Sequence, residues 1–271
     1  MSRENLENNA ELKIVCQRPD CIQRYVSIYI TRFILKFNLM SPTQVTVLDF
    51  FIGLIGVALF FLESDWAFLI GALMMQLFEI FDCVDGEVAR YLIYKGELNR
   101  SEDEKAEVEF IQDIVHIILQ PLMFLGFSFG LYLHFSYLFI LLLGFIAASG
   151  SAIDTYINIL REKLLGSVGL KDCSRVYKEI RGTGEKLLYK IPFGRYILDF
   201  MTFVTPIPGV LVVILIASIL DLGLLGPGGN FVLFNYDLNF KILILAAYAL
   251  IEQALWILNA AGSIKSFKSL K

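Results

Sequence analysis

The sequence predicts an all-α integral membrane protein, a bundle of six transmembrane helices preceded by an interfacial amphipathic helix. Of its 271 residues 56% are hydrophobic and only 18% are charged, whereas soluble domains are about half apolar and about a quarter charged. The apolar residues gather in blocks long enough for the roughly 20 helical residues that cross a hydrocarbon core. Because a backbone in lipid must satisfy its own hydrogen bonds, each block is expected to be a helix. The blocks are 43–62, 66–89, 110–132, 136–160, 197–220 and 240–261.

Basic residues predict how these helices are oriented. Of the 23 Lys and Arg residues, 22 lie before the first block, after the second, after the fourth or after the last. The other three connections hold none, and Lys241 begins the sixth block. Because Lys and Arg concentrate in cytoplasmic loops, both termini are expected in the cytoplasm. The polar, acidic first residues predict that there is no cleavable signal peptide.

The chain is expected to have two parts. Residues 1–40 form a cytoplasmic tail and an interfacial helix, and residues 41–271 form a six-helix transmembrane catalytic domain. Ser41 is a suitable N-cap, and Pro42 suits the first turn of the first spanning helix. The external segment Gly223–Asn235 is expected to be a plain turn.

The interfacial helix is predicted from residues 21–37, where large apolar residues recur at helical spacing. Tyr25 and Tyr29 share one face, while Ser27 and Thr31 lie roughly opposite. This pattern is typical of a helix that lies in the plane of the cytoplasmic interface. Packing against the underside of the bundle is the alternative, and both can hold.

The end of the second block holds the strongest candidates for chemistry, because ionisable residues inside spanning helices are costly. Asp82 and Asp85 lie one helical turn apart, on a face that Glu79 shares. Two such carboxylates in a partly dry setting repel each other unless a cation joins them. Ligands that are all oxygen suit Mg²⁺, Mn²⁺ or Ca²⁺.

Three further residues complete a pattern at this helix end. Gly86 and Ala89 remove side-chain bulk beside the acids, and Arg90 is placed to meet a phosphate. The resulting sequence, DCVDGEVAR, fits DxxDGxxAR, so the chain resembles the CDP-alcohol phosphatidyltransferases. The segment SPTQVT at 41–46 is also similar to the TPNQVT of that family, with Thr43 where Asn is usual.

The resemblance implies a metal-dependent membrane transferase that acts as a homodimer at the cytoplasmic face. In this family the first three Asp of the signature hold Mg²⁺ or Mn²⁺ around a CDP diphosphate, and the fourth accepts the proton of the acceptor alcohol. The alcohol oxygen attacks the distal phosphorus and CMP leaves. By this resemblance Asp82 and Asp85 bind metal, whereas Gly86, Ala89 and Arg90 contact the donor. The partners are a CDP-alcohol, a hydroxyl acceptor and membrane lipids; no sequence pattern suggests nucleic acid.

The second half of the family signature, GxxxDxxxD, is altered. At the family's spacing after the first half stand Asn99, Asp103 and Glu107. Counting from the outer ends of the second and third helices instead places residues 109–116 level with the two aspartates, and makes 90–108 an inserted connection. At a rise of 1.5 Å per residue, Asp103 would sit roughly 15 Å too low.

Within this layer, His116 followed by Pro121 looks like a family variant in which His replaces the fourth Asp and acts as general base. Gln112 stands where the third Asp belongs, and Asp113 is its neighbour, about 100° round the helix. Either Asp113 reaches the metals or the site has lost a ligand.

Three hypotheses follow. The leading one is a metal-dependent enzyme that transfers a phospho-alcohol or phosphatidyl group from a CDP-linked donor to a hydroxyl. The second is a weakened relative that binds nucleotide or lipid without turnover, because Gln112 is not acidic. The third is an ion-coupled transporter. The lack of inverted repeats and the position of the acids near the inner edge of the membrane argue against it.

Overall fold

The structure is a computed structural model that describes residues 22–97, 102–167, 207–233 and 236–269. The predicted tail before residue 22 and the first ten residues of the fifth predicted block, 197–206, lie outside this part of the chain. Contacts group the chain into two compact units. The first comprises Met1–Ala58 and Ile70–Val115, and the second comprises Leu59–Leu69 and His116–Lys271.

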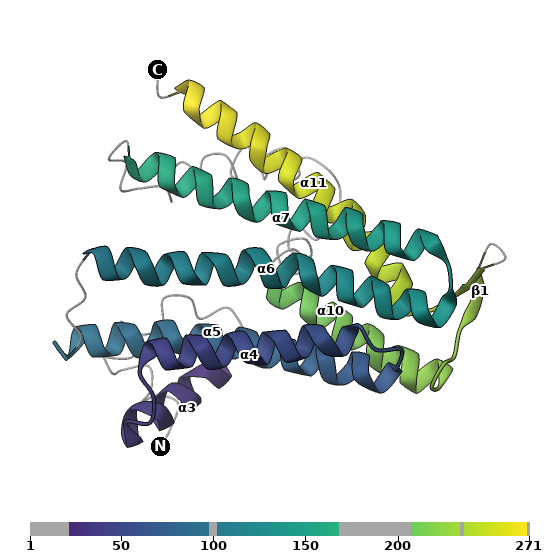
Figure 1. Ribbon diagram of the computed structural model, residues 1–271, viewed down its shortest axis with the longest axis horizontal. Helices are drawn as coiled ribbons and strands as arrows, with labels where there is room; N and C mark the ends of the chain where they lie inside the picture. Colours follow the sequence, from purple (N-terminus) through teal and green to yellow (C-terminus); the bar gives the residue numbers. More distant parts are fainter. Residues whose placement is uncertain (1–21, 98–101, 168–206, 234–235, 270–271) are drawn as a thin grey trace, which may run out of the picture. The chain divides into compact units, whose positions relative to one another are not determined.

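Within the described residues, five helices are long and apolar enough to span a membrane, as expected of a multi-pass integral membrane protein (Figure 1). The spans are Pro42–Phe60, Asp65–Tyr94, Phe110–Phe135, Leu138–Ile157 and Phe240–Ile257. They belong to helices α4 (Pro42–Phe60), α5 (Asp65–Tyr94), α6 (Glu102–Phe135), α7 (Leu138–Ser167) and α11 (Phe240–Ser269). The fifth predicted block contains α10 (Ile207–Leu220), which is shorter.

Helix α4 begins as its sequence predicts. The Ser41 hydroxyl accepts a hydrogen bond from the Gln44 backbone N–H (3.3 Å), and the Gln44 side-chain oxygen accepts one from the Ser41 N–H (2.9 Å). These reciprocal bonds form a capping box, which satisfies two backbone donors that a helix start leaves open. Pro42, at the first helical position, has no N–H to satisfy.

The predicted connection at 90–108 is mostly helical, so that expectation was wrong in extent. Helix α5 continues to Tyr94, and α6 already begins at Glu102. The added residues of α5 are the apolar YLIY, and α6 opens with EDEKAEVE. Acidic residues stabilise the first turn of a helix through its dipole, which explains why this charged run is helical.

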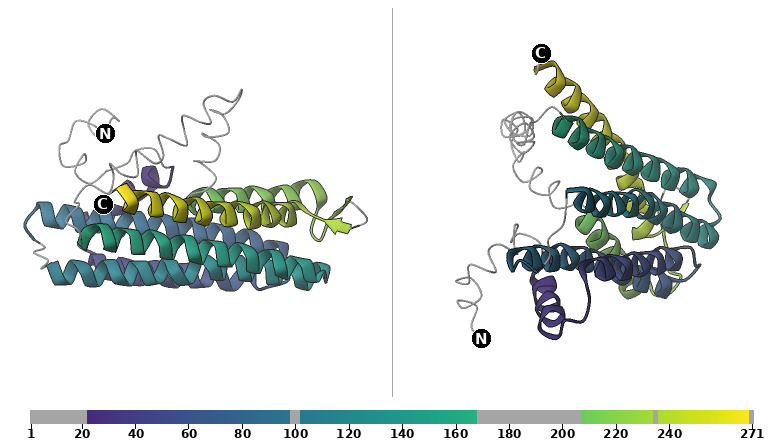
Figure 2. Two further views of the ribbon diagram at one scale, coloured as in Figure 1. Left: turned by 90° about the horizontal axis from the view of Figure 1, so that it is seen from above. Right: turned by 60° about the vertical axis from the view of Figure 1, so that its left-hand side comes forward.

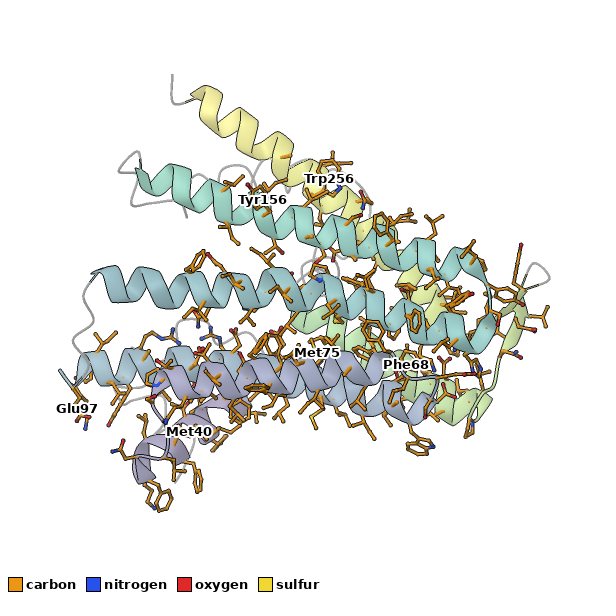
Figure 3. All side chains as sticks on the ribbon, viewed as in Figure 1. Met40, Phe68, Met75, Glu97, Tyr156 and Trp256 are labelled. Atoms are coloured by element: carbon orange, nitrogen blue, oxygen red, sulfur yellow. The ribbon has the colours of Figure 1, made fainter. Side chains whose placement is uncertain are left out.

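Helix α3 (Ile22–Phe37) is inclined steeply to α4 and α5 (Figures 1 and 2). Its buried Ile34 packs with Val45 of α4 and with Val84 and Val88 of α5. At another contact within this unit, Met75 of α5 fills the space beside Gly56 of α4 (Figure 3), where an added Cβ would come within 3.0 Å of Met75. The first unit is therefore joined by close apolar packing near the predicted site.

In the second unit, α7 and α11 lie side by side along much of their length (Figures 1 and 2). Gly150 of α7 permits this approach, because a Cβ there would lie 2.8 Å from Glu252 of α11. Small residues are common at such contacts between membrane helices. Gln253 adds a hydrogen bond from its amide to the Ile146 carbonyl (2.7 Å).

The segment expected to be a plain turn has more structure than predicted. The π-helical turn η1 (Asp221–Leu225) is followed by an antiparallel hairpin of β1 (Phe231–Leu233) and β2 (Tyr236–Leu238). Gly226 and Gly228 have φ values of 79° and 71°, a conformation that L side chains rarely adopt. These glycines explain the tight return of the chain between η1 and β1.

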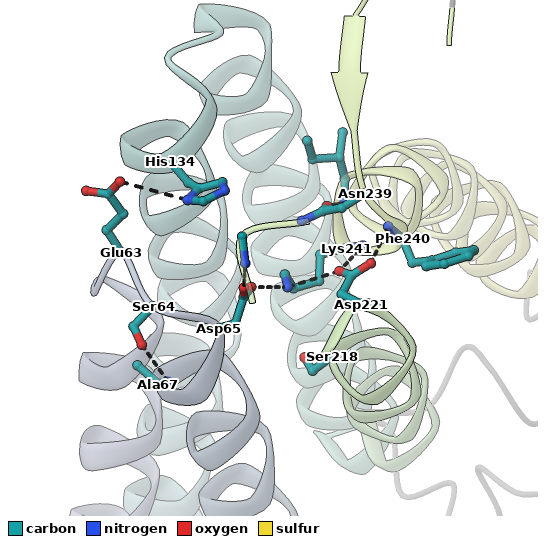
Figure 4. A network of polar contacts seen from close by, with 12 residues as sticks. Glu63, Ser64, Asp65, Ala67, His134, Ser218, Asp221, Asn239, Phe240 and Lys241 are labelled. Carbon is teal, nitrogen blue, oxygen red and sulfur yellow. Dashed lines mark hydrogen bonds and ion pairs between the residues drawn. The ribbon is translucent and has the colours of Figure 1, made fainter. Parts of the chain in front are cut away.

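A buried lysine joins three segments of the second unit (Figure 4). The Lys241 ammonium lies 2.6 Å from Oδ1 of Asp65 and 3.0 Å from Oδ2 of Asp221, and the Lys241 side chain is 1% exposed. Asp221 also accepts the backbone N–H of Phe240 (2.8 Å), at the first residue of α11. One charged cluster therefore connects the starts of α5, η1 and α11.

Candidate functional site

Four carboxylates gather in the first unit, three from α5 and one from α4. Glu79, Asp82 and Asp85 share a face of α5, as the sequence predicts. Asp49 of α4 is close enough for all three to repel its charge. Asp49, Glu79 and Asp85 are only 2%, 6% and 3% exposed. So much negative charge in a poorly hydrated place is costly unless a cation or hydrogen bonds offset it.

Hydrogen bonds account for one oxygen of Asp85. Its Oδ2 accepts a bond from the Thr46 hydroxyl of α4 (2.8 Å) and another from the Gln112 amide of α6 (2.9 Å). Thr46 belongs to the SPTQVT segment at the start of α4. Three helices thus meet at a single carboxylate.

The buried oxygens of this cluster that have no hydrogen-bond partner in the described part of the chain include Oδ1 of Asp49 and Oδ1 of Asp85. A buried acceptor without a partner is expensive, and a bound cation would satisfy both charge and lone pairs. Within the described residues, no three His, Cys, Asp or Glu side chains are arranged to hold a metal ion. Mg²⁺ nevertheless often binds through one or two carboxylates, with waters and phosphates as its other ligands. The donors fit that kind of open site.

Gln112 contacts Asp85 through its amide nitrogen, so a residue of the layer 109–116 does meet an aspartate of α5, as counting residues from the outer helix ends predicts. On the continuous α6, Asp103 lies nine residues, or about 14 Å, away from Gln112. The register taken from literal family spacing is therefore disfavoured. In this arrangement Gln112 is a neutral donor to Asp85 and adds no negative charge.

Asp113 and His116, the other candidates on α6, are both partly exposed. His116 follows Gln112 by four residues and belongs to the second unit. The roles of metal ligand for Asp113 and of general base for His116 remain predictions.

Arg90 covers the glycine of the motif. A Cβ added to Gly86 would lie 3.0 Å from one guanidinium nitrogen of Arg90 and 3.5 Å from the other. The room that Gly86 leaves is thus used by Arg90, which lies one turn farther along α5 than the glycine. Ala89, the other small residue of the motif, is partly exposed. A guanidinium next to the acidic cluster suits a phosphate-containing ligand with bound divalent cations. The acids would bind the cations and the guanidinium would bind the phosphate.

Sequence reasoning missed two buried acids in this unit, Asp49 and Glu87. Asp49 interrupts the apolar run of the first block, and an acid inside a spanning helix is by itself a signal of function. Glu87 occupies a variable position of DxxDGxxAR and faces α3. Helical periodicity separates Glu87 from the face of Asp82 and Asp85, but its partners on α3 could not be read from the sequence.

Comparison with models of protein families and with curated proteins finds no match for this chain.

Proposed function

We propose that the chain is a metal-dependent membrane enzyme that transfers a phospho-alcohol or phosphatidyl group from a CDP-linked donor to a hydroxyl acceptor, with release of CMP. The observation that carries the proposal is the pattern DxxDGxxAR on a membrane-length helix whose acids meet Asp49 in a buried cluster. There, Oδ1 of Asp49 and Oδ1 of Asp85 have no hydrogen-bond partner among the described residues. Its resemblance to the signature of the CDP-alcohol phosphatidyltransferases supplies the reaction.

Each side chain has a role in this proposal. Asp82 and Asp85 hold Mg²⁺ or Mn²⁺, which would neutralise charge on the phosphoryl oxygens. Asp49 supplies a further carboxylate from α4, in compensation for the neutral Gln112. Thr46 and Gln112 orient Asp85 through their hydrogen bonds. Gly86, Ala89 and Arg90 receive the diphosphate of the donor.

The proton of the acceptor hydroxyl needs a base. His116 is proposed for this role, because an imidazole can accept a proton near neutral pH. His116 follows Gln112 by four residues in the sequence. Asp113 is the alternative third carboxylate beside Asp49. The most direct test of the reaction is metal-dependent release of CMP from CDP-alcohols.

The proposal also includes the wider architecture. Six spanning helices, with the segment that contains α10 as the fifth, would place both termini in the cytoplasm. Helix α3 would lie in the cytoplasmic interface, where the exposed rings of Tyr25, Tyr29, Phe33 and Phe37 meet lipid. As in the resembling family, the assembly would be a homodimer.

Labelling tests the orientation. Single cysteines introduced as Ser2→Cys and Ser269→Cys, with the native cysteines replaced, should resist a membrane-impermeant maleimide in intact cells and react after permeabilisation. The expectation rests on the 22 of 23 basic residues that fall on one side. Reaction of either cysteine in intact cells would refute the topology.

A second candidate function is a relative that binds nucleotide or lipid without turnover. The hydrogen bond from Gln112 to Asp85 favours it, because an amide donor stands where a third metal-binding acid is expected. Variants that add or remove one carboxylate at residues 49 and 112 separate the two candidate functions.

If Asp49 compensates for Gln112, Asp49→Asn should weaken Mn²⁺ binding about tenfold or more, since a charge-assisted contact contributes more than a neutral one. The double variant Asp49→Asn with Gln112→Asp should recover much of the loss, whereas Gln112→Asp alone should gain nothing because like charges crowd. Mn²⁺ titration by electron paramagnetic resonance measures this. The exposed Asp237, changed to Asn, is the matched control. A large gain in metal affinity and turnover from Gln112→Asp alone would instead support the non-catalytic candidate.

A further inference from the structure

Glu87 lies inside the motif but points away from the acidic face. Its side chain is fully buried, at 0% exposure. Its two oxygens are shared between two hydroxyls of α3: Ser27 donates to Oε1 (2.9 Å) and Thr31 donates to Oε2 (2.7 Å). A carboxylate held on both oxygens from one neighbouring helix is fixed in position, since each bond to a charged group is stronger than a neutral one.

Two arginines balance the charge of Glu87. Arg24 of α3 and Arg90 of α5 both attract it. Arg90 is the residue whose guanidinium covers Gly86. The negative charge of Glu87 therefore attracts the Arg90 guanidinium, and the absence of a Cβ at Gly86 leaves the space in which the guanidinium lies.

Helix α3 presents its polar side to α5. Gln23, Ser27 and Thr31 are buried, and Gln23 donates to Gln76 of α5 (3.1 Å). The aromatic side is turned outward, with Tyr29 64% exposed. A surface helix usually packs through its apolar face, whereas α3 also buries polar side chains against α5. Its hydroxyl contacts with Glu87 therefore do more than bury apolar surface.

We propose that Glu87 is a positioning residue through which α3 sets the placement of Arg90, and thereby the affinity of the site for the diphosphate of the donor. The inference rests on the proposed function. Ser27 and Thr31 hold the Glu87 carboxylate through hydrogen bonds. The carboxylate lies three residues before Arg90 on α5 and attracts its guanidinium, which in turn would meet phosphate. The hydrogen bonds that hold Glu87 involve neither Asp49 nor Asp85, so we expect cation affinity to change little when they are removed.

Two variants break the chain at different points. Ser27→Ala with Thr31→Val removes both hydroxyls but leaves the Glu87 charge, and Glu87→Gln keeps the shape and removes the charge. Ser218→Ala is the matched control, because that buried hydroxyl bonds within its own helix, to the Ile214 carbonyl (2.9 Å). The full-length protein in lipid nanodiscs is used throughout. CDP binding is measured by calorimetry in Mg²⁺, Mn²⁺ binding is measured separately, and kcat and KM are measured with a CDP-alcohol.

Each variant should raise the Kd for CDP and the KM for the donor about tenfold, roughly the effect of losing one charge-assisted hydrogen bond. The kcat and the Mn²⁺ affinity should stay within about twofold of those of the unmodified protein. The interaction that is lost binds the ground state and the transition state equally, so its loss raises KM and leaves kcat unchanged. Combining the variants should add little, since they act through one pathway.

The inference is overturned if the variants lower thermal stability but leave CDP affinity and KM at the values of the control, which would make Glu87 a purely structural residue. It is also overturned if Mn²⁺ affinity falls in parallel with CDP affinity, since the whole site would then be disturbed. If the unmodified protein binds Mn²⁺ and CDP but the variants match it, only this inference fails. If the unmodified protein binds neither, the proposed function fails and the inference fails with it.

Discussion

Replacing Asp85 with Asn is expected to reduce metal-dependent turnover by about 10² or more, because bound cations provide most of the electrostatic stabilisation in such a reaction. Asp85 is 3% exposed, and its Oδ1 has no hydrogen-bond partner among the described residues. Asn would keep the shape and an acceptor for Thr46, but it removes the negative charge. Mn²⁺ affinity should fall together with the rate.

The comparison needs a control that changes the same chemical group elsewhere. Asp237→Asn, on the exposed face of β2, should leave both CMP release and Mn²⁺ binding unchanged. Thermal stability of the Asp85→Asn protein should be retained, because like-charge repulsion within the cluster is relieved. An Asp85→Asn protein with unaltered rate and unaltered Mn²⁺ affinity would show that the acidic cluster is not the site.

Replacing Lys241 with Met should give the largest loss of stability, about 3–5 kcal/mol in the free energy of unfolding, because the buried Asp221 and the partly exposed Asp65 would both lose their cation. The Lys241 and Asp221 side chains are 1% and 2% exposed, and Asp65 also accepts the Gly228 backbone N–H (2.6 Å). Met fills a similar volume, so the loss reports on charge rather than on a cavity.

Reversible unfolding in mixed micelles measures this change. Adding Asp65→Asn and Asp221→Asn to the Lys241→Met variant should recover a large part of the stability, since no uncompensated charge then remains. Lys95→Met, at the exposed end of α5, is the matched control and should be nearly neutral. If Lys241→Met costs less than about 1 kcal/mol, or the triple variant is less stable still, the cluster does not depend on charge balance.

Much of the fold follows from local sequence. Membrane-length apolar blocks and the Ser41 cap depend on neighbouring residues, and the structure has both. The ends of the helices were predicted less accurately, because a polar run such as EDEKAEVE can form either a helix or a loop. The bond pattern around Lys241 was not predictable, since its partner Asp65 lies 176 residues away.

The candidate site was predictable only in part for the same reason. Counting helical rise placed Gln112 level with Asp85, and the two are in contact. The contributions of Asp49 and Glu87 depend on how α3 and α4 pack against α5, which periodicity within a single helix does not specify. Asp49 is an acid within an apolar block, which is a signal of function that the sequence itself contains.

CMP release from a panel of CDP-alcohols, measured with the purified protein in nanodiscs with and without Mn²⁺, tests the central claim most directly. We expect release that requires both Mn²⁺ and an acceptor alcohol, and that is lost in Asp85→Asn but kept in Asp237→Asn. Nucleotide and Mn²⁺ binding without any CMP release across the panel would contradict it, and would assign the chain to the non-catalytic candidate.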